Sequence, residues 1–264
     1  MNIFVRELKA NLRSLIIWAV IVVLFVTVGV SKFSAYYENP EMLAILDEMP
    51  QAMLAAFSIQ AFNLTTVTGF FGLMFTYFAL LLSIAAAMWG SDIITKEERD
   101  KTVEFSLTLP VTRSRLVTAK ALAALVNCIA LLLITWAASL VSASPYQPDS
   151  EFYGFLRLSM LALFIMQLIF LAIGILLGCA MKRYKRAGAV AIALLLGTYF
   201  LSVISSLSKD LEFLKYFTPF KYFDAGILAR ESRLDLTFVG LSLAIIVASM
   251  VGAYVTYARR DLYI

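Results

Sequence analysis

Long stretches without a charged residue constrain this chain more than any other feature of its sequence. They run from Ser14 to Ser31, Met49 to Ser91, Ala121 to Pro148, Leu158 to Met181, Ala187 to Ser208 and Leu236 to Ala258. An α-helix rises about 1.5 Å per residue, so roughly 20 apolar residues cross the ~30 Å hydrocarbon core of a bilayer. The apolar runs are continuous rather than alternating, unlike the strands of a membrane β-barrel. The sequence therefore predicts an all-α integral membrane protein.

The second stretch is too long for one crossing, and polar residues between Asn63 and Gly69 divide it. We expect residues 41–62 to form an external interfacial helix and the remainder to form a span. The whole chain, residues 1–264, is then a single transmembrane domain. Its six predicted spans cover approximately residues 14–33, 67–91, 116–142, 157–181, 187–208 and 236–258.

The distribution of charge predicts the orientation. With six spans, both termini lie on one side, which then carries 15 basic and 7 acidic residues, against 7 basic and 11 acidic residues on the other. Basic residues concentrate on the cytoplasmic side of inserted segments, so we expect both termini in the cytoplasm. This is the pattern of a multi-pass protein of a cell membrane, here a bacterial plasma membrane. The net charge of +4 follows from this topology, and nucleic acid is not an expected partner.

Residues 2–13 place Phe4, Leu8 and Leu12 at helical spacing, with basic residues on other faces. This pattern predicts an amphipathic N-terminal interfacial helix whose cations lie near anionic headgroups. The alternative is that these residues extend the first span. Between spans five and six, residues 209–235 are rich in aromatic residues, which predicts short external helices broken near Pro219. This segment is either an aromatic belt or a participant in substrate release.

The sequence lacks the common catalytic motifs. There is no GxxxxGK phosphate loop, no Gly-x-Ser-x-Gly elbow, no HExxH pair and no histidine, so neither an enzyme nor a metal site is predicted. The predicted hydrocarbon cores lack the ionisable residues that ion-driven carriers use, which disfavours a secondary carrier. Asn127 and Gln167 are candidates for a substrate path, although such residues also join helices to one another.

The longest densely charged segment, residues 96–115, lies between spans two and three. Thr95 and Glu98 have the spacing of a capping box at a helix start, Pro110 ends a short helix, and Thr112 can cap the next. We therefore expect a helix, a bend and a second helix below the membrane. The run EERDKTVEFSLTLPVTRSRLVTAK resembles the cytoplasmic loop of ABC-2 type permeases, the membrane subunits of certain ATP-driven exporters. The residues at matching places are Glu97, Glu98, Lys101, Thr102, Glu104, Pro110, Val111, Thr112, Arg113 and Lys120, with Lys101 where the family often has glycine.

Two further stretches resemble the same family: TPFKYFDAGIL before the last span and ARRDLY near the carboxyl end. The resemblance implies a coupling helix that docks on a dimer of cytoplasmic ABC ATPase subunits, which bind ATP and Mg, while this chain binds no cofactor. The ATPase contacts that it implies are Glu97, Glu98, Thr102, Val103, Glu104, Phe105, Leu107, Pro110 and Arg113.

The resemblance also implies a second permease, identical or homologous, and outward movement of a substrate. Uncharged cores and aromatic external segments favour an amphipathic or lipid-soluble substrate such as a peptide, toxin, antibiotic or lipid. Two other interpretations remain open at this point. In one, the charged loop is only solvated and fixes topology, and in the other the chain is a membrane scaffold or sensor that recruits a cytoplasmic regulator.

Overall fold

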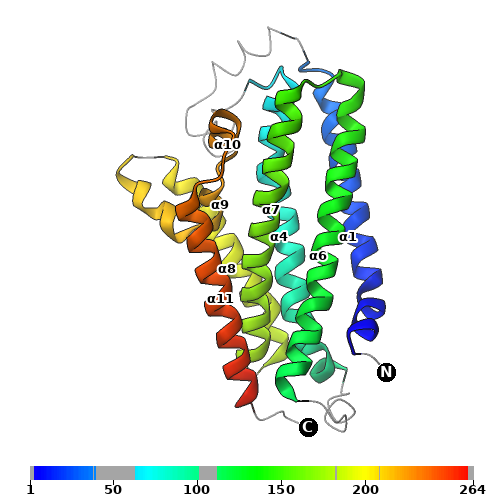
Figure 1. Ribbon diagram of the computed structural model, residues 1–264, viewed down its shortest axis with the longest axis vertical. Coiled ribbons are helices and arrows are strands. Elements are labelled where there is room, and N and C mark those ends of the chain that lie inside the picture. The colour runs from blue at the N-terminus through cyan, green and yellow to red at the C-terminus, as the bar shows by residue number, and fades with distance from the viewer. Residues whose placement is uncertain are drawn as a thin grey trace.

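Helices make up nearly all of the regular structure in the computed structural model, which describes residues 3–37, 39, 63–100, 112–181, 183–207 and 209–260 (Figure 1). The long helices run roughly side by side. The elements are α1 (Ile3–Phe33), α4 (Val67–Arg99), α6 (Arg113–Ala143), η2 (Ser144–Tyr146), α7 (Ser150–Ala180), α8 (Tyr184–Ser205), η3 (Lys209–Phe217), α9 (Pro219–Tyr222), α10 (Ala225–Glu231) and α11 (Leu236–Ala258).

Six of the helices in the described ranges are long and apolar enough to cross a membrane: α1, α4, α6, α7, α8 and α11. This confirms the predicted all-α class and the six candidate spans. Both described ends of the chain, Ile3 and Arg260, lie at the same end of the bundle, drawn at the bottom of Figure 1 and called here the lower end. The opposite end, called the upper end, carries η3, α9 and α10.

Helices α4 and α7 form the centre of the bundle and touch backbone to backbone. A Cβ atom added to Gly90 would lie 2.4 Å from the Leu171 carbonyl oxygen, and one added to Gly174 would lie 2.5 Å from the Ala87 carbonyl oxygen. Glycine is required at both positions because any side chain would force the two helices apart. The two helices run in the same direction, from the upper end to the lower end.

The other four long helices surround this pair. Helix α1 packs mainly on α6, α8 on α4, and α11 on α7. Each outer helix keeps an exposed apolar face, for example Leu243, Val247 and Val251 at four-residue intervals along α11. Apolar stripes of this kind face lipid when a bundle spans a bilayer.

The predicted short helices between the last two spans are confirmed. They are η3, α9 and α10, with the break at Thr218 and Pro219 opening α9. The buried Thr218 hydroxyl donates to the Thr198 carbonyl at 2.8 Å, which ties the break to α8. The predicted helix over residues 41–62 lies outside the described residues.

Two predicted boundaries are wrong. Residues 3–13 are not a separate amphipathic interfacial helix, because α1 is one continuous helix from Ile3 to Phe33, the alternative that the sequence had left open. Helix α4 continues to Arg99, so no helix starts at Thr95 and no capping box forms there. The Thr95 hydroxyl instead donates to the Ser91 carbonyl at 2.9 Å within the helix.

Candidate functional site

A cluster of paired charges joins the helices at the lower end of the bundle. Four cations and three carboxylates take part, drawn from α1, α4, α6 and the residues after α11. We call this cluster the lower charge network, and its members are Arg6, Glu7, Lys96, Glu97, Glu98, Lys120 and Arg260.

Glu97 is the centre of the network. One of its carboxylate oxygens accepts a hydrogen bond from Arg6 Nη2 at 3.1 Å, and the other lies 3.2 Å from Lys120 Nζ. Lys120 is only 1% exposed and also donates to the Ile93 carbonyl at 2.9 Å. Isolated buried charges are very costly, so this lysine and this glutamate are retained inside the protein only as partners. Through them, α4 is joined to both α1 and α6.

Glu7 makes a second connection between α1 and α4. Its side chain is fully buried and pairs with Lys96 and, at 3.4 Å, with Arg6. One turn further along α1, the buried Asn11 amide donates to the Glu7 carbonyl at 3.0 Å. Glu7 and Asn11 therefore pack against the bundle together with Phe4 and Leu8, whereas Leu12 is 52% exposed. Of the cations predicted to lie near lipid headgroups, Arg6 instead pairs with Glu7 and Glu97, while the placement of the exposed Lys9 and Arg13 stays a prediction.

Arg260 closes the network from the carboxyl-terminal side. Its Nη2 atom donates to Glu98 at 2.8 Å and to the Met181 carbonyl at 2.9 Å, and its Nη1 atom donates to the Gly178 carbonyl at 2.7 Å. Carbonyl groups at a helix end have no partner within the helix, and a cation there is favourable. Arg260 thus caps α7 and holds the end of α4 at the same time.

Arg113, the first residue of α6, is hydrogen-bonded to the same segment at the end of α11. Its Nη1 atom donates to the carbonyl oxygens of Tyr257, Ala258 and Arg260, the last at 2.6 Å. Immediately before it, the Thr112 side chain accepts a hydrogen bond from the Arg115 amide, which confirms the predicted cap of this helix. The end of α4 and the start of α6, which flank residues 101–111, are therefore both bonded to the segment after α11.

The predicted coupling residues divide into two groups. Thr102, Val103, Glu104, Phe105, Leu107 and Pro110 lie outside the described residues. Glu97, Glu98 and Arg113 are described, and all three make bonds within the chain at the lower end. Sequence reasoning missed that Glu97 pairs with Arg6 and Lys120 and that Glu98 pairs with Arg260. It also missed the neighbouring pair of Glu7 and Lys96. The available signal was Glu7, the one acidic residue among the basic residues of the first 13.

The two candidate residues of a substrate path are both buried between helices. Asn127 is 2% exposed and Gln167 is fully buried. The Asn127 amide nitrogen and both amide atoms of Gln167 have no hydrogen-bond partner among the described residues. The Ser83 hydroxyl is also buried and has no hydrogen-bond partner among the described residues. Ser83 lies seven residues before Gly90, and Gln167 lies seven residues before Gly174. Seven residues are about two helical turns, so the two side chains continue the faces on which α4 meets α7.

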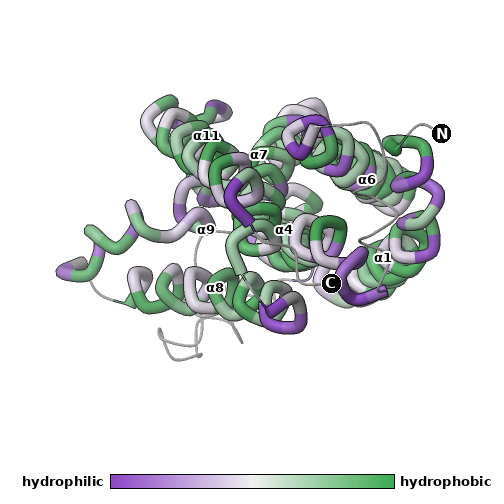
Figure 2. Tube along the Cα trace, turned by 90° about the horizontal axis from the view of Figure 1, so that it is seen from below, coloured by the Kyte–Doolittle hydropathy of each residue, from purple (hydrophilic) through white to green (hydrophobic). Residues whose placement is uncertain are grey.

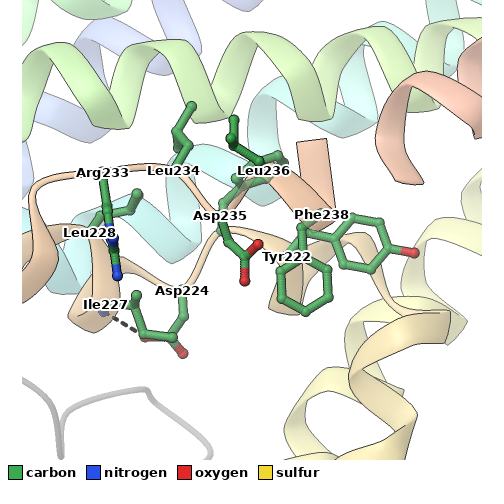
Figure 3. A pocket seen from close by; sticks show the side chains of 10 residues that line it. Tyr222, Asp224, Ile227, Leu228, Arg233, Leu234, Asp235, Leu236 and Phe238 are labelled. Atoms are coloured by element: carbon green, nitrogen blue, oxygen red, sulfur yellow. Dashed lines mark hydrogen bonds between the residues drawn. The ribbon is translucent and has the colours of Figure 1, made fainter. Parts of the chain in front are cut away.

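A cavity of about 610 Å³ lies at the upper end, where α9 and α10 meet the start of α11 (Figure 3). The rings of Tyr222 and Phe238 stack there at 5.1 Å between centroids. Asp224 and Asp235 also line it, and each carboxylate caps the helix that follows. Burial raises the pKa of the Tyr222 hydroxyl, which donates to the Tyr216 carbonyl at 2.6 Å. The cavity therefore has an aromatic wall and a charged rim that includes Arg233 beside the two carboxylates.

Six apolar helices, with a buried charge network at the lower end and a loop held there at both ends, define a multi-pass membrane protein of the helical-bundle type. The model of the ABC-2 family transporter proteins matches residues 1–262, and the chain belongs to that family. It is thus the membrane permease component of an ABC-2 transporter, a type that typically lacks the ATPase domain and pairs with ABC ATPase subunits. No curated protein is significantly similar to it in sequence.

Proposed function

We propose that this permease couples ATP hydrolysis by separate cytoplasmic ABC ATPase subunits to outward movement of an amphipathic or lipid-soluble substrate. In this proposal two permeases, identical or homologous, pair around a path, and two ATPase subunits bind below them with ATP and Mg. The chain itself performs no chemistry. The lower end, with both termini, is cytoplasmic in a bacterial plasma membrane, and the upper end is external, as the excess of basic residues at the lower end favours.

The observation that carries the proposal is the attachment of both ends of residues 101–111. Glu98, one residue before the end of α4, pairs with Arg260, and Arg113 at the start of α6 donates to the Arg260 carbonyl. A displacement of the loop would therefore be transmitted to α4, α6 and α7 together. A solvated loop that only fixes topology would not need such attachment.

We further propose that the predicted coupling residues have two different roles. Thr102, Val103, Glu104, Phe105, Leu107 and Pro110 supply the surface that docks on the ATPase, because docking requires a hydrophobic insert and an orienting charge. Glu97, Glu98 and Arg113 transmit its displacement to the helices, since their charged groups already have partners inside the bundle. In the same proposal Asn127 and Gln167 contact the substrate along its path, and the aromatic cavity at the upper end receives it for release.

Coupling can be tested with the permease purified together with its ATPase. Glu104→Arg, or deletion of residues 102–107, is expected to abolish co-purification and substrate-stimulated ATP hydrolysis. The matched control is Glu212→Arg, a reversal of an exposed carboxylate in η3 at the upper end, which is expected to leave both unchanged. Binding and coupling that survive the loop variants would overturn the assignment.

Orientation is tested separately by labelling single introduced cysteines in intact cells with a membrane-impermeant maleimide. The native Cys128 and Cys179 are buried and are not expected to react. Phe213→Cys, at an exposed position of the upper end, is expected to react from outside. Arg259→Cys, exposed at the lower end, is expected to react only after the cells are opened. The reverse pattern would contradict the proposed topology.

A further inference from the structure

Two buried polar residues, Ser83 and Gln167, lie on the central helices α4 and α7. Figure 2, seen from below, shows these two helices next to each other. Both residues are 0% exposed, and each lies near the middle of its helix. The middle of a membrane-spanning helix is remote from bulk water, so a buried polar group there needs a partner inside the protein.

The backbone contacts between α4 and α7 fix the register of the two helices. A Cβ atom added to Gly90 would lie 2.4 Å from the Leu171 carbonyl oxygen, and one added to Gly174 would lie 2.5 Å from the Ala87 carbonyl oxygen. A Cβ atom added at position 178 would likewise lie 3.0 Å from the Cβ atom at position 94. The equivalent positions, each 84 residues apart, are therefore 87 with 171, 90 with 174 and 94 with 178.

Ser83 and Gln167 continue this register by one turn toward the upper end. They precede Ala87 and Leu171 by four residues each, and they too are 84 positions apart. Residues four apart lie on the same face of a helix, and α4 and α7 run in the same direction. The two polar residues therefore lie at the same level on the two faces that meet.

Neither polar group is satisfied by the protein. The Ser83 hydroxyl and both amide atoms of Gln167 have no hydrogen-bond partner among the described residues. A helical serine or threonine can donate to the carbonyl oxygen four residues before it, as Ser91 does to Ala87 and Thr95 does to Ser91. Ser83 lies on the same helix but does not make this bond. Its hydroxyl is thus left available to a group between the two helices.

The chemistry of the pair selects an uncharged ligand that both donates and accepts hydrogen bonds. A hydroxyl and a primary amide each offer a donor and an acceptor, and neither carries a charge. A buried ion would need an opposite charge beside it, which this pair does not supply. A water molecule bridges polar groups that do not bond directly, and buried waters typically satisfy groups of this kind.

We propose that a water molecule binds between Ser83 and Gln167 and joins α4 to α7. It accepts a hydrogen bond from one of the two side chains and donates one to the other. The bridge adds a polar contact one turn from the close approach of the two backbones. Contact of Gln167 with a substrate, as proposed above, would displace this water. The inference itself concerns the resting permease and does not depend on transport or on ATP.

The first test is a double-mutant cycle on the purified permease, with the thermal unfolding midpoint as the measurement. Ser83→Ala and Gln167→Met each remove one side of the bridge, and methionine keeps the length of glutamine. Each substitution is expected to lower the midpoint by roughly 2–4 °C. The double variant is expected to fall no further than the larger single loss, because the bridge is already broken.

The matched control is Ser91→Ala, at a second buried serine of α4 whose hydroxyl bonds within its own helix. Its effect on the midpoint is expected to add to that of Gln167→Met, since the two side chains share no partner. Additive losses for Ser83→Ala and Gln167→Met would overturn the proposal. A higher midpoint for Gln167→Met would also overturn it, because the amide would then be unpaired in the native protein.

The second test distinguishes a water bridge from a direct bond between the two side chains. The chain has four glutamines, so ¹⁵N labelling of glutamine gives few side-chain signals in an NMR spectrum, and Gln167→Met identifies the signal of Gln167. A cross-peak between the Gln167 amide protons and a long-lived water is expected, and it is expected to weaken in Ser83→Ala. Absence of this cross-peak in the unaltered protein would overturn the proposal, even where a variant fails to fold.

Discussion

Arg260 and Glu98 lie 2.8 Å apart, with the guanidinium against the carboxylate, although 162 positions separate them in the chain. Their side chains are 9% and 11% exposed. The pair joins the segment after the last helix to the end of α4, where residues 101–111 begin.

The first prediction concerns this pair. Arg260→Ala leaves the Glu98 carboxylate and the carbonyl groups at the end of α7 without their cation, and we expect a loss of about 3 kcal/mol in the free energy of unfolding. Thermal unfolding in detergent measures it. Arg259→Ala, at an exposed neighbour, is the control and is expected to change stability by under about 0.5 kcal/mol. Similar effects of the two substitutions would show that the ion pair is not maintained.

The second prediction ranks two substitutions within one contact. Glu97→Gln leaves Lys120 buried with no carboxylate partner from the network, whereas Lys120→Met leaves Glu97 still paired with Arg6. Removal of the charge partner of a buried ion costs more than its replacement by an apolar side chain of similar length. We therefore expect Glu97→Gln to lower the unfolding midpoint more than Lys120→Met does. The opposite order would contradict the central place of Glu97.

The third prediction tests which face of α1 meets the bundle. Glu7→Lys places a second cation against Lys96 in a buried site and is expected to prevent stable expression. Glu7→Lys combined with Lys96→Glu restores opposite charges and is expected to recover part of the folded protein. The measurement is the monodisperse fraction in gel filtration. Failure of the exchange together with tolerance of Glu7→Lys alone would mean that the carboxylate faces outward.

The fourth prediction concerns the backbone contact between α4 and α7. Gly174→Ala adds a methyl group 2.5 Å from the Ala87 carbonyl oxygen, so the helices must separate, at a cost of about 1–3 kcal/mol. Gly154→Ala is matched on the same helix, where the new Cβ meets nothing within 4 Å, and it is expected to be neutral or stabilising by up to about 1 kcal/mol. Equal melting temperatures for the two variants would exclude the close approach.

The bundle as a whole could be predicted because charge-free runs of sufficient length have few alternatives in water or in lipid. The short helices near Pro219 and the cap at Thr112 were predictable for a local reason, since proline and a capping hydroxyl act within a few residues of themselves. The pairing of α4 with α7 was not predictable in this way. Gly90 and Gly174 are far apart in the sequence, and nothing local in either helix identifies the other as its partner.

The lower charge network was missed for a different reason. A helical pattern shows that two faces of α1 differ, but it does not show which face meets lipid and which meets protein. The charges at Glu97 and Glu98 were likewise interpreted as facing a partner, because their cations on α1 and after α11 are distant in sequence. A buried ion pair can be recognised only when both partners are known, and the sequence alone does not show which distant cation lies next to each glutamate.

The contact between Gly90 and Gly174 also provides a fixed reference for measuring motion. Two helices whose backbones touch cannot slide past each other without a clash, so a pair of spectroscopic probes on α4 and α7 should report a constant distance through a transport cycle. Probes on α1 or α8, paired with one on α4, would then report displacement against a stationary frame. Helices α4 and α7 thus form a fixed reference against which the movements of the other helices of this transporter can be measured.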